Sequence, residues 1–528
     1  MTRSTLLLIA STALVAGCGG GGGGGGGSSS PPSFTVSGTA MYEKKGIDAT
    51  TATLTTTLTN TPVPNALVEV VDTSNGSTIA TGATNALGEF SVSVAASFEA
   101  GTILVRVRTK SSVAFTEVEV GNNSGVVYSV SSGTFSGAQA GLSLLATADD
   151  ATGRVAGAFN IFTQVMRGME FVRSVDPAAT FPALAAIWEI GQTPVIPPCT
   201  CATHVHLGGD TVFVFGVEDS ASDTDDFDDS VILHEFAHYL QANFSRNSSP
   251  GGDHINCDPS QDLDYRLSFG EGWGNAFAQM VLGDPIYVDT KPAGGFTQNM
   301  ETACLDVIGA GSESALNAVF WDLFDGPTSG IISTDADTLD LGFGPIWQAM
   351  KWLRDNATDI YVGDFLVALV VNGSITVAQW DANFGPGGPQ DLGLQTPLPA
   401  FPPFFLDPNT PPTAQGVNAS LGQQSLFVAS QYYEVTLTSA GTLTINVAIT
   451  NPGTTPGTNN LDLYLWETGS SDPDGHPPGE RLAVSETDTG VETISMPLSA
   501  GTYMIQVRAR SFPIGEAAAG FTIETTFP

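Results

Sequence analysis

One short stretch constrains this chain more than any other: VILHEFAHYL, residues 231–240. It places His234 and His238 four residues apart around Glu235 in an otherwise apolar run, although the whole chain has only six histidines. In an α-helix, residues four apart lie on one face, about one turn from each other. Two imidazoles at that spacing can bind one tetrahedral zinc ion. The stretch therefore predicts a helix over 229–243 that presents two metal ligands, His234 and His238.

Glu235 follows the first of these histidines and is not needed as a ligand. Zinc lowers the pKa of its water toward neutrality, and a carboxylate beside the metal can accept the proton. We therefore expect Glu235 to be the catalytic base of a hydrolase. Asp228 and Asp229 precede the helix, where we expect their carboxylates to cap free backbone amides. The plainer alternative is a helix whose two histidines bind no metal.

A catalytic zinc ion usually has three protein ligands and a water molecule. The extended pattern with a third histidine fails, because Gln241 and Phe244 stand where glycine and histidine are required. The run LSFGEGWGNAFAQMVLG, 267–283, instead offers Glu271 among small residues that would let a second helix approach the first closely. This pair of motifs resembles the gluzincin metallopeptidases. The resemblance implies that Glu271 is the third zinc ligand of an α+β, zincin-like catalytic domain.

Two departures from the gluzincin pattern concern the same region. The segment between His238 and Glu271 is longer than in thermolysin-like members, so we expect an inserted loop. Asn275 stands where those members carry an aspartate that orients a zinc-bound histidine, and an amide would transfer less basicity to the ligand. Asp322, in the segment NAVFWDLFDG, is a second candidate for a place behind the ligands. An aminopeptidase G-x-M-E-N motif is absent, which favours an endopeptidase.

The resemblance also implies a tyrosine or histidine that stabilises the oxyanion of a tetrahedral intermediate. No motif marks this residue, and the candidates are Tyr265, His254 and Tyr287. Asp253 and His254 are a less favoured alternative pair of metal ligands. The strand expected at 210–217 precedes the metal-binding helix, as the edge strand that binds extended substrate does in zincins.

The chain begins with MTRSTLLLIASTALVAGC, a basic residue followed by an apolar run too short to span a bilayer. Residues 1–17 are therefore predicted to be a signal peptide. The end of this run, LVAGC, resembles a bacterial lipobox, which implies cleavage before Cys18 and lipidation of its thiol. Residues 18–33 would then form a glycine- and serine-rich tether. We expect a lipid-anchored protein at the bacterial outer membrane or cell surface.

The chain has 17 basic and 54 acidic residues and a net charge of −37. This charge disfavours nucleic acid as a partner and is typical of an exported surface protein. The acidic loop 218–230 carries the oxygen ligands that Ca²⁺ prefers, but a solvated loop that caps the helix is the favoured interpretation.

Four cysteines follow Cys18, and an even number in an exported protein predicts two disulfides. They are Cys199, Cys201, Cys257 and Cys304. The first two are too close together to pair comfortably, so we expect each to bond one of the last two. The tract CTCATHVH also contains His204 and His206, which makes a metal site there the less favoured alternative.

The flanking segments are rich in short alternating strands. Residues 34–130 include PVPNALVEVVDTSNGSTIATGATNALGEFSVSV, which resembles the transthyretin-like, carboxypeptidase regulatory-like sandwich, and we interpret it as a spacer or adhesive module. Residues 140–400 mix strands and helices, which is typical of an α+β domain. A proline-rich linker covers 397–413. Residues 414–528 contain YYEVTLTSAGTLTINV and NNLDLYLWE, which resemble the bacterial pre-peptidase C-terminal domain.

The sequence thus predicts a multidomain chain, in which an α+β zincin-like catalytic domain is flanked by two all-β sandwich domains. The predicted function is that of a lipid-anchored zinc metallopeptidase acting on peptide or protein substrates. Two alternatives stay open: a non-catalytic surface adhesin, and a zinc hydrolase of non-peptide substrates.

Overall fold

The structure is a computed structural model. It describes residues 32–149, 153–192, 203–205, 210–214, 216, 224–249, 263–301, 308–326, 338–357, 360–389, 391–398, 404–417, 430–450, 460–467, 481–487, 490–511 and 519–528. Cys18, the four candidate disulfide cysteines, Asp253, His254 and His206 lie outside the described residues.

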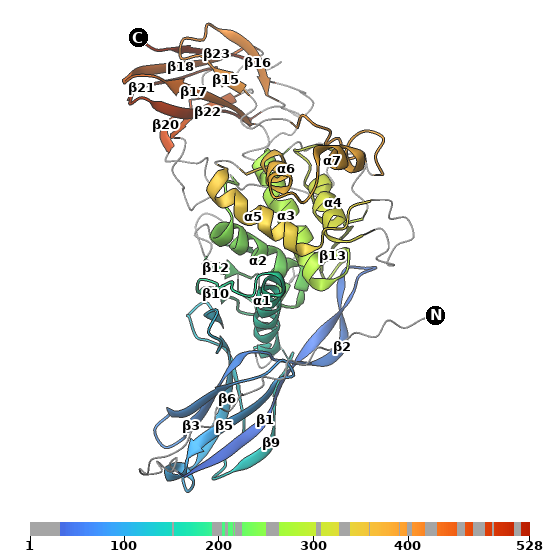
Figure 1. The fold of residues 1–528 in the computed structure, drawn as a ribbon. Coiled ribbons are helices and arrows are strands. Elements are labelled where there is room, and N and C mark those ends of the chain that lie inside the picture. The colour runs from blue at the N-terminus through green and yellow to red at the C-terminus, as the bar shows by residue number, and fades with distance from the viewer. Residues whose placement is uncertain are drawn as a thin grey trace, which may run out of the picture.

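Three parts follow one another along the molecule (Figure 1): a β-sandwich drawn in blue, a mainly helical region in green and yellow, and a second β-sandwich in orange and red. The prediction of β regions on both sides of a mixed helical region is confirmed at this level. Among the described residues, no helix is both long enough and apolar enough to cross a bilayer.

The first sandwich consists of two sheets. Its smaller sheet contains β1 (Ser33–Asp48), β2 (Thr53–Pro62), β5 (Glu89–Ala95) and β9 (Gln139–Ala146). The larger sheet contains β3 (Ala66–Asp72), β4 (Ser77–Ala83), β6 (Ile103–Ser111), β7 (Val118–Gly121) and β8 (Ser129–Ser131), together with β10 (Leu184–Ile187), β11 (His204–Val205) and β12 (Thr211–Phe213). In β5, alternate residues Phe90, Val92 and Val94 are buried, because successive side chains of a strand point to opposite faces.

The larger sheet continues from the sandwich into the helical region. β10 pairs in parallel with β7, and β12 pairs in parallel with β10. β11 then folds back and pairs antiparallel with the other side of β12. The expectation of an edge strand at 210–217 is therefore wrong for Thr211–Phe213, because both sides of this strand are already paired.

A 3₁₀ turn, η1 (Ala96–Phe98), lies between β5 and β6 of the first sandwich. The helical region contains one 3₁₀ turn, seven α-helices and one hairpin among its described residues. They are α1 (Val155–Val175), η3 (Asp225–Phe227), α2 (Asp229–Phe244), α3 (Tyr265–Leu282), β13 (Ile286–Asp289), β14 (Phe296–Asn299), α4 (Glu313–Phe324), α5 (Phe343–Asn356), α6 (Val362–Val371) and α7 (Val377–Phe384). The helices expected near 230–243, 269–283, 313–325 and 344–355 are present. A continuous hydrophobic core extends from Phe34 in β1 to Leu394 beyond α7, so the first sandwich and the helices share it.

A long hairpin, the β1–β2 arm (41–62), extends from the first sandwich onto the helical region (Figure 1). Lys44 forms an ion pair with Asp229 in the first turn of α2, and the Lys45 ammonium lies 5.8 Å from the centroid of the Phe227 ring. At the tip, the carbonyl of Ala52 accepts hydrogen bonds from the amides of Lys291 and Gly295, both at 3.0 Å. The arm therefore contacts η3, the first turn of α2 and the turn between β13 and β14.

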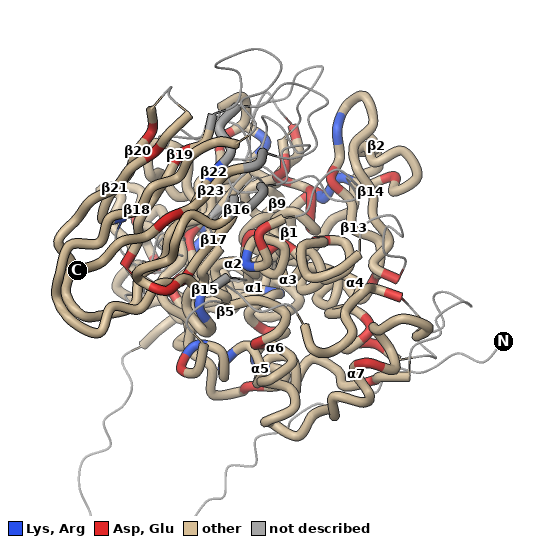
Figure 2. The backbone as a smooth tube through the Cα atoms, turned by 90° about the horizontal axis from the view of Figure 1, so that it is seen from above, with Lys and Arg blue, Asp and Glu red and all other residues tan. Residues whose placement is uncertain are grey.

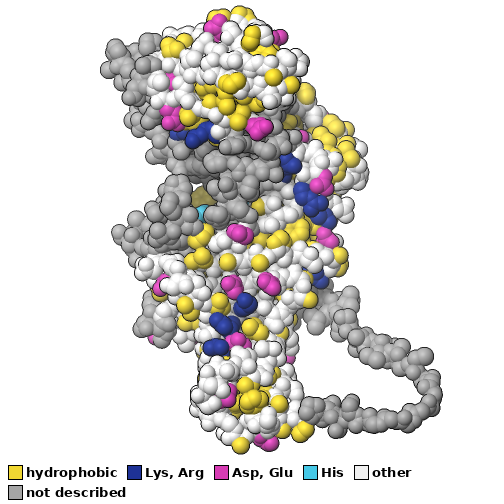
Figure 3. Space-filling view, turned by 90° about the vertical axis from the view of Figure 1, so that its left-hand side faces the viewer, with side chains coloured by type: hydrophobic (Ala, Val, Ile, Leu, Met, Phe, Trp, Pro, Cys, Tyr) yellow, Lys and Arg dark blue, Asp and Glu magenta, His cyan; other side chains and the backbone are white. Residues whose placement is uncertain are grey.

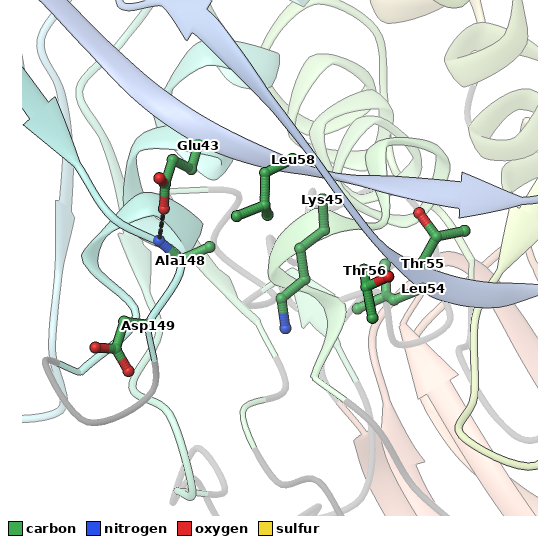
Figure 4. Close-up of a pocket in the computed structure, with 8 residues that line it drawn as sticks. All are labelled: Glu43, Lys45, Leu54, Thr55, Thr56, Leu58, Ala148 and Asp149. Carbon is green, nitrogen blue, oxygen red and sulfur yellow. Dashed lines mark hydrogen bonds between the residues drawn. The ribbon is translucent and has the colours of Figure 1, made fainter.

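A pocket of about 400 Å³ lies beneath the arm, where the side chains in Figure 4 converge. Its lining residues are Glu43, Lys45, Leu54, Thr55, Thr56, Leu58, Ala148 and Asp149. None of these residues is a predicted metal ligand, so this pocket is separate from the predicted site.

The second sandwich has its own hydrophobic core, formed by side chains such as Tyr433, Leu463 and Ile505. One sheet contains β15 (Phe404–Leu406), β17 (Ser430–Leu437), β22 (Gly501–Ser511), β19 (Asn460–Glu467) and β20 (Arg481–Ser485). The other contains β16 (Thr413–Val417), β23 (Ala519–Thr526), β18 (Gly441–Ile449) and β21 (Val491–Leu498). The Arg266 guanidinium, at the start of α3, lies 5.0 Å from the centroid of the Tyr432 ring in this sandwich.

Candidate metal centre

Helix α2 carries the two predicted histidine ligands. Apolar residues such as Ile232, Phe236 and Leu240 are fully buried and fix the helix in the core. Asp228 is the N-cap residue, but its carboxylate does not cap the helix amides. Instead it accepts hydrogen bonds from the amide and the hydroxyl of Thr290, at 2.9 and 3.0 Å. The predicted capping contact is therefore wrong for Asp228, because Thr290, directly after β13, donates to this carboxylate instead.

Helix α3 carries Glu271 and packs directly against α2. The Asp264 carboxylate accepts a hydrogen bond from the Arg266 amide and starts the helix, and Gly283 ends it in the left-handed region at φ 69°. Gly274 faces the His234 ring so closely that a Cβ atom at this position would lie 2.7 Å from the His234 ring atoms. Glycine is required here, because any larger residue would collide with the imidazole.

The structure brings His234, His238 and Glu271 together, with ligand atoms of all three within 4.8 Å of one another. Nε2 of His234 lies 3.1 Å from Oε2 of Glu271 and 3.0 Å from Nε2 of His238. Nε2 of His238 lies 3.4 Å from the same Glu271 oxygen. Donor atoms about 2.0–2.1 Å from a tetrahedral zinc ion are roughly 3.3 Å apart, so this triangle has the size of one face of a zinc site.

Asn275 determines which nitrogen of His234 faces this triangle. Its Nδ2 donates to Oε1 of Glu313 at 2.7 Å, so its Oδ1 is the atom that lies 2.7 Å from Nδ1 of His234. In the neutral imidazole, Nδ1 of His234 then carries the hydrogen and Nε2 keeps its lone pair. That lone pair points at the Glu271 carboxylate, an arrangement that favours a cation between them. The donor set therefore fits a metal ion.

Glu235 is buried beside the ligands, with 7% of its surface exposed. Tyr287, in β13, is also buried, and its ring centroid lies 6.3 Å from that of His234. Burial, and then the negative charges of Asp289 and Glu235, raise the pKa of the Tyr287 hydroxyl well above its usual value. This hydroxyl therefore keeps its proton at neutral pH. Of the candidate oxyanion donors, Tyr287 lies in ring contact with a predicted ligand.

The roles predicted for the other candidates stay predictions, and His254 lies outside the described residues. Tyr265 is the first residue of α3, about 9 Å along the helix axis from Glu271. Asp322 is buried in α4, about 14 Å along its axis from Glu313. His204, from the alternative CTCATHVH site, stacks on Phe213, with ring centroids 5.2 Å apart. On the face drawn in Figure 3, a histidine side chain reaches the surface between the helical region and the second sandwich.

The described part of the acidic loop is buried, so its interpretation as a solvated loop is wrong there. Asp226 and Asp228 are fully buried, and Asp225 and Asp229 are 9% exposed. Thr203 donates to Asp225, Arg154 pairs with Asp226 at 3.4 Å, and Lys44 pairs with Asp229. These partners come from the β1–β2 arm, from the start of α1 and from the residue before β11, which together cover the described part of the loop.

Carboxylates of this loop form a second group with Asp289. The ligand atoms of Asp225, Asp228 and Asp289 lie within 4.8 Å of one another, so these residues could hold a cation. Calcium binding, which the sequence offered as the less favoured alternative, stays a prediction.

Sequence reasoning missed Glu313, the residue behind Asn275. It lies in the first turn of α4, after the N-cap Ser312, whose side chain accepts a hydrogen bond from the amide of Ala315. A glutamate at that position reads as an ordinary helix-start residue, because acidic side chains are favoured there. No local pattern connects it to a helix 38 residues earlier in the chain.

No family model and no curated protein matches the sequence. Among solved structures, the pre-peptidase C-terminal domain of collagenase from Bacillus anthracis is 10% identical, with 23% of this chain and 93% of that chain covered and a TM-score of 0.17. It belongs to the domain class that the sequence predicts for 414–528.

Two further structures show likenesses of similar extent. CorA, a surface-associated copper-binding protein from Methylomicrobium album BG8, is 14% identical over 24% of this chain and 97% of that chain, with a TM-score of 0.18. A family 35 carbohydrate-binding module of Abf62 from Cellvibrio japonicus is 12% identical over 22% of this chain and 97% of that chain, with a TM-score of 0.13.

Proposed function

We propose that this chain is a zinc-dependent metallopeptidase of the gluzincin type with a zincin-like catalytic domain. His234, His238 and Glu271 would hold the ion. The observation that carries the proposal is the convergence of these three donor atoms, with Asn275 leaving the Nε2 lone pair of His234 free to bind a metal.

A zinc ion at this position would polarise a substrate carbonyl and acidify a water molecule. Glu235 lies next to the first ligand in α2 and is buried at the site. Its carboxylate accepts the proton of the attacking water and then delivers this proton to the leaving amine nitrogen as the C–N bond breaks. A buried carboxylate suits this exchange, since the surrounding protein excludes competing water.

Tyr287 would stabilise the negative charge that develops on the carbonyl oxygen. Its hydroxyl belongs to a buried side chain in ring contact with His234, and its raised pKa keeps it a hydrogen-bond donor at neutral pH. A positioned donor of this kind contributes most when charge develops in a site that is shielded from water.

The predicted lipobox before Cys18 and the net charge indicate the surroundings in which we place this activity. A lipid on Cys18 would hold the protein at the bacterial outer membrane or cell surface, where peptides and proteins are the substrates. Acidic positions are spread over the backbone drawn in Figure 2, with few basic ones among them. This surface disfavours nucleic acid as a partner.

The test compares the wild type with Glu235→Gln and with Glu301→Gln, a control glutamate of matched burial, 8% exposed against 7%. Zinc per chain and the hydrolysis of casein are measured for each protein. We expect one zinc per chain in all three. Hydrolysis should fall by about 10²–10⁴-fold in Glu235→Gln alone, because only that variant lacks the general base.

Two outcomes would contradict the proposal. Equal hydrolysis by Glu235→Gln and wild type would remove the assigned base. Zinc without any hydrolysis of casein by the wild type would instead favour a non-catalytic adhesin or a hydrolase of non-peptide substrates.

A further inference from the structure

Glu313 lies one hydrogen bond behind the residue that orients His234. Its carboxylate accepts a hydrogen bond from Nδ2 of Asn275 at 2.7 Å, and the opposite atom of the same amide, Oδ1, lies 2.7 Å from Nδ1 of His234. Three helices thus contribute to one chain of contacts, with His234 on α2, Asn275 on α3 and Glu313 on α4.

The residues of this chain of contacts are buried, and neighbouring side chains fix their positions. Asn275 and Glu313 are each only 5% exposed. Nδ2 of Asn275 also lies 3.4 Å from Oδ1 of Asn317, which in turn donates through its own Nδ2 to Gln298 at 3.1 Å. Gly272 lets α3 and α4 approach, because a Cβ atom there would lie 2.7 Å from Cβ of Leu316. The Asn275 amide therefore has one favoured orientation.

The Glu313 carboxylate compensates for the negative charge that the neutral Asn275 amide lacks. A neutral amide behind a metal-bound imidazole raises its basicity less than a carboxylate does. Hydrogen bonds in series polarise one another, more strongly where water is excluded. A carboxylate that accepts from the Asn275 NH₂ group therefore makes its Oδ1 a stronger acceptor for the hydrogen on Nδ1 of His234.

We propose that Glu313 is a positioning residue of the metal centre, acting through Asn275 to fix His234 in the tautomer whose Nε2 is free to bind. The inference rests on the proposed metal binding and adds to it a charge supplied by a different helix. In this chain the Asn275 amide lies between His234 and the carboxylate of Glu313.

The test measures zinc affinity in the full-length protein by competition with a chromophoric chelator, and it records the visible absorption of the cobalt form. Glu313→Gln keeps the size of the side chain and removes its charge, and we expect zinc affinity to fall about tenfold. The swap variant N275D/E313Q moves the carboxylate next to His234, where the new glutamine amide can donate to it. This variant should bind zinc within about threefold of wild type. The control Glu301→Gln, a buried glutamate that accepts from Trp321 at 2.8 Å, should leave zinc affinity unchanged.

Four results separate the alternatives. Wild-type affinity in Glu313→Gln overturns the inference. Equal loss in Glu313→Gln and in the swap variant also overturns it, because a purely structural role would not be rescued by moving the charge. If Glu313→Gln does not fold, the swap variant alone decides, with near-wild-type affinity in support and a tenfold loss against. Undiminished zinc affinity in His234→Ala would instead contradict the proposed metal site itself, independently of Glu313.

Discussion

The two β-sandwiches of this protein relate to its metal centre in different ways. The first shares a sheet with the helical region through the pairing of β7 with β10, and its core is continuous with that of the helices. The second has a separate core and meets α3 through Arg266 and Tyr432. The sequence predicts both sandwiches to be independent modules, but only the second has a hydrophobic core of its own.

The first sandwich therefore does more than space the helices from an anchor. Its β1–β2 arm places Lys44 against the first turn of α2 and binds the turn after β13 through Ala52. His234 lies in α2, and Tyr287 lies in β13, directly before that turn. A substitution that destabilises the first sandwich should therefore also destabilise the metal centre. An equally destabilising substitution in the second sandwich should not.

Core truncations in the two regions should give the largest effects. Phe159→Ala, in α1, removes a fully buried ring from the shared core and should destabilise it by about 3–5 kcal/mol. Ile505→Ala should destabilise only the second sandwich, by about 2–5 kcal/mol. Differential scanning calorimetry should show two transitions, and zinc should raise only the one that Phe159→Ala lowers. A single transition, or two transitions both raised by zinc, would show that the regions are not distinct.

Gly274→Ala tests how closely α3 approaches His234 on α2. The added Cβ would meet the His234 ring at 2.7 Å, and overpacking of this kind costs about 1–3 kcal/mol. Zinc affinity should fall with it. Gly270→Ala on the same helix is the control, since its Cβ would have no atom nearer than 3.5 Å and alanine favours a helix. Equal zinc affinity in the two variants would contradict the close approach of α3 to His234.

Lys44→Met tests the arm alone. Loss of the partly buried ion pair with Asp229 should lower the stability of the zinc-dependent transition by about 1 kcal/mol. Its counterpart, Tyr432→Leu, removes the ring beside Arg266 and should cost the second sandwich about 0.5–1 kcal/mol. Zinc affinity should be unchanged there, because Asp264 still starts α3. If Tyr432→Leu weakened zinc binding more than Lys44→Met, the roles of the two sandwiches would be reversed.

A pH-dependent effect is expected at Asp176, which follows α1. A hydrogen bond from Lys351 is the main cause that lowers the pKa of its carboxyl below the usual 3.8 in the folded state. The ionised carboxylate therefore stabilises the fold above that value, and this contribution is lost as pH falls through the lower folded pKa. Asp176→Asn should cost about 1 kcal/mol at neutral pH. In denaturant titrations, the difference from wild type should shrink below about pH 4. A difference that grows on acidification would contradict the assignment.

Local patterns predicted what depends on neighbouring residues. The spacing of His234 and His238 predicted α2, and the small residues around Glu271 predicted the close approach of α3. The resemblance to gluzincins drew attention to Asn275, which the structure places against Nδ1 of His234.

Contacts between distant segments could not be predicted in this way. The carboxylate of Asp228 appeared to be a helix cap, but Thr290, 62 residues away, binds it. The aspartates around 225–229 were predicted to be solvated, because no pattern in the loop predicts its contact with the β1–β2 arm. Glu313 is linked to the site only by the packing of α4 on α3.

The most direct test of the metal centre is the zinc K-edge X-ray absorption spectrum of the zinc-loaded full-length protein. Binding by His234, His238, Glu271 and a water molecule predicts only nitrogen and oxygen scatterers at about 2.0–2.2 Å, with two imidazole rings. Sulfur scatterers at about 2.3 Å would assign the zinc to cysteine residues and would contradict the site built on α2 and α3.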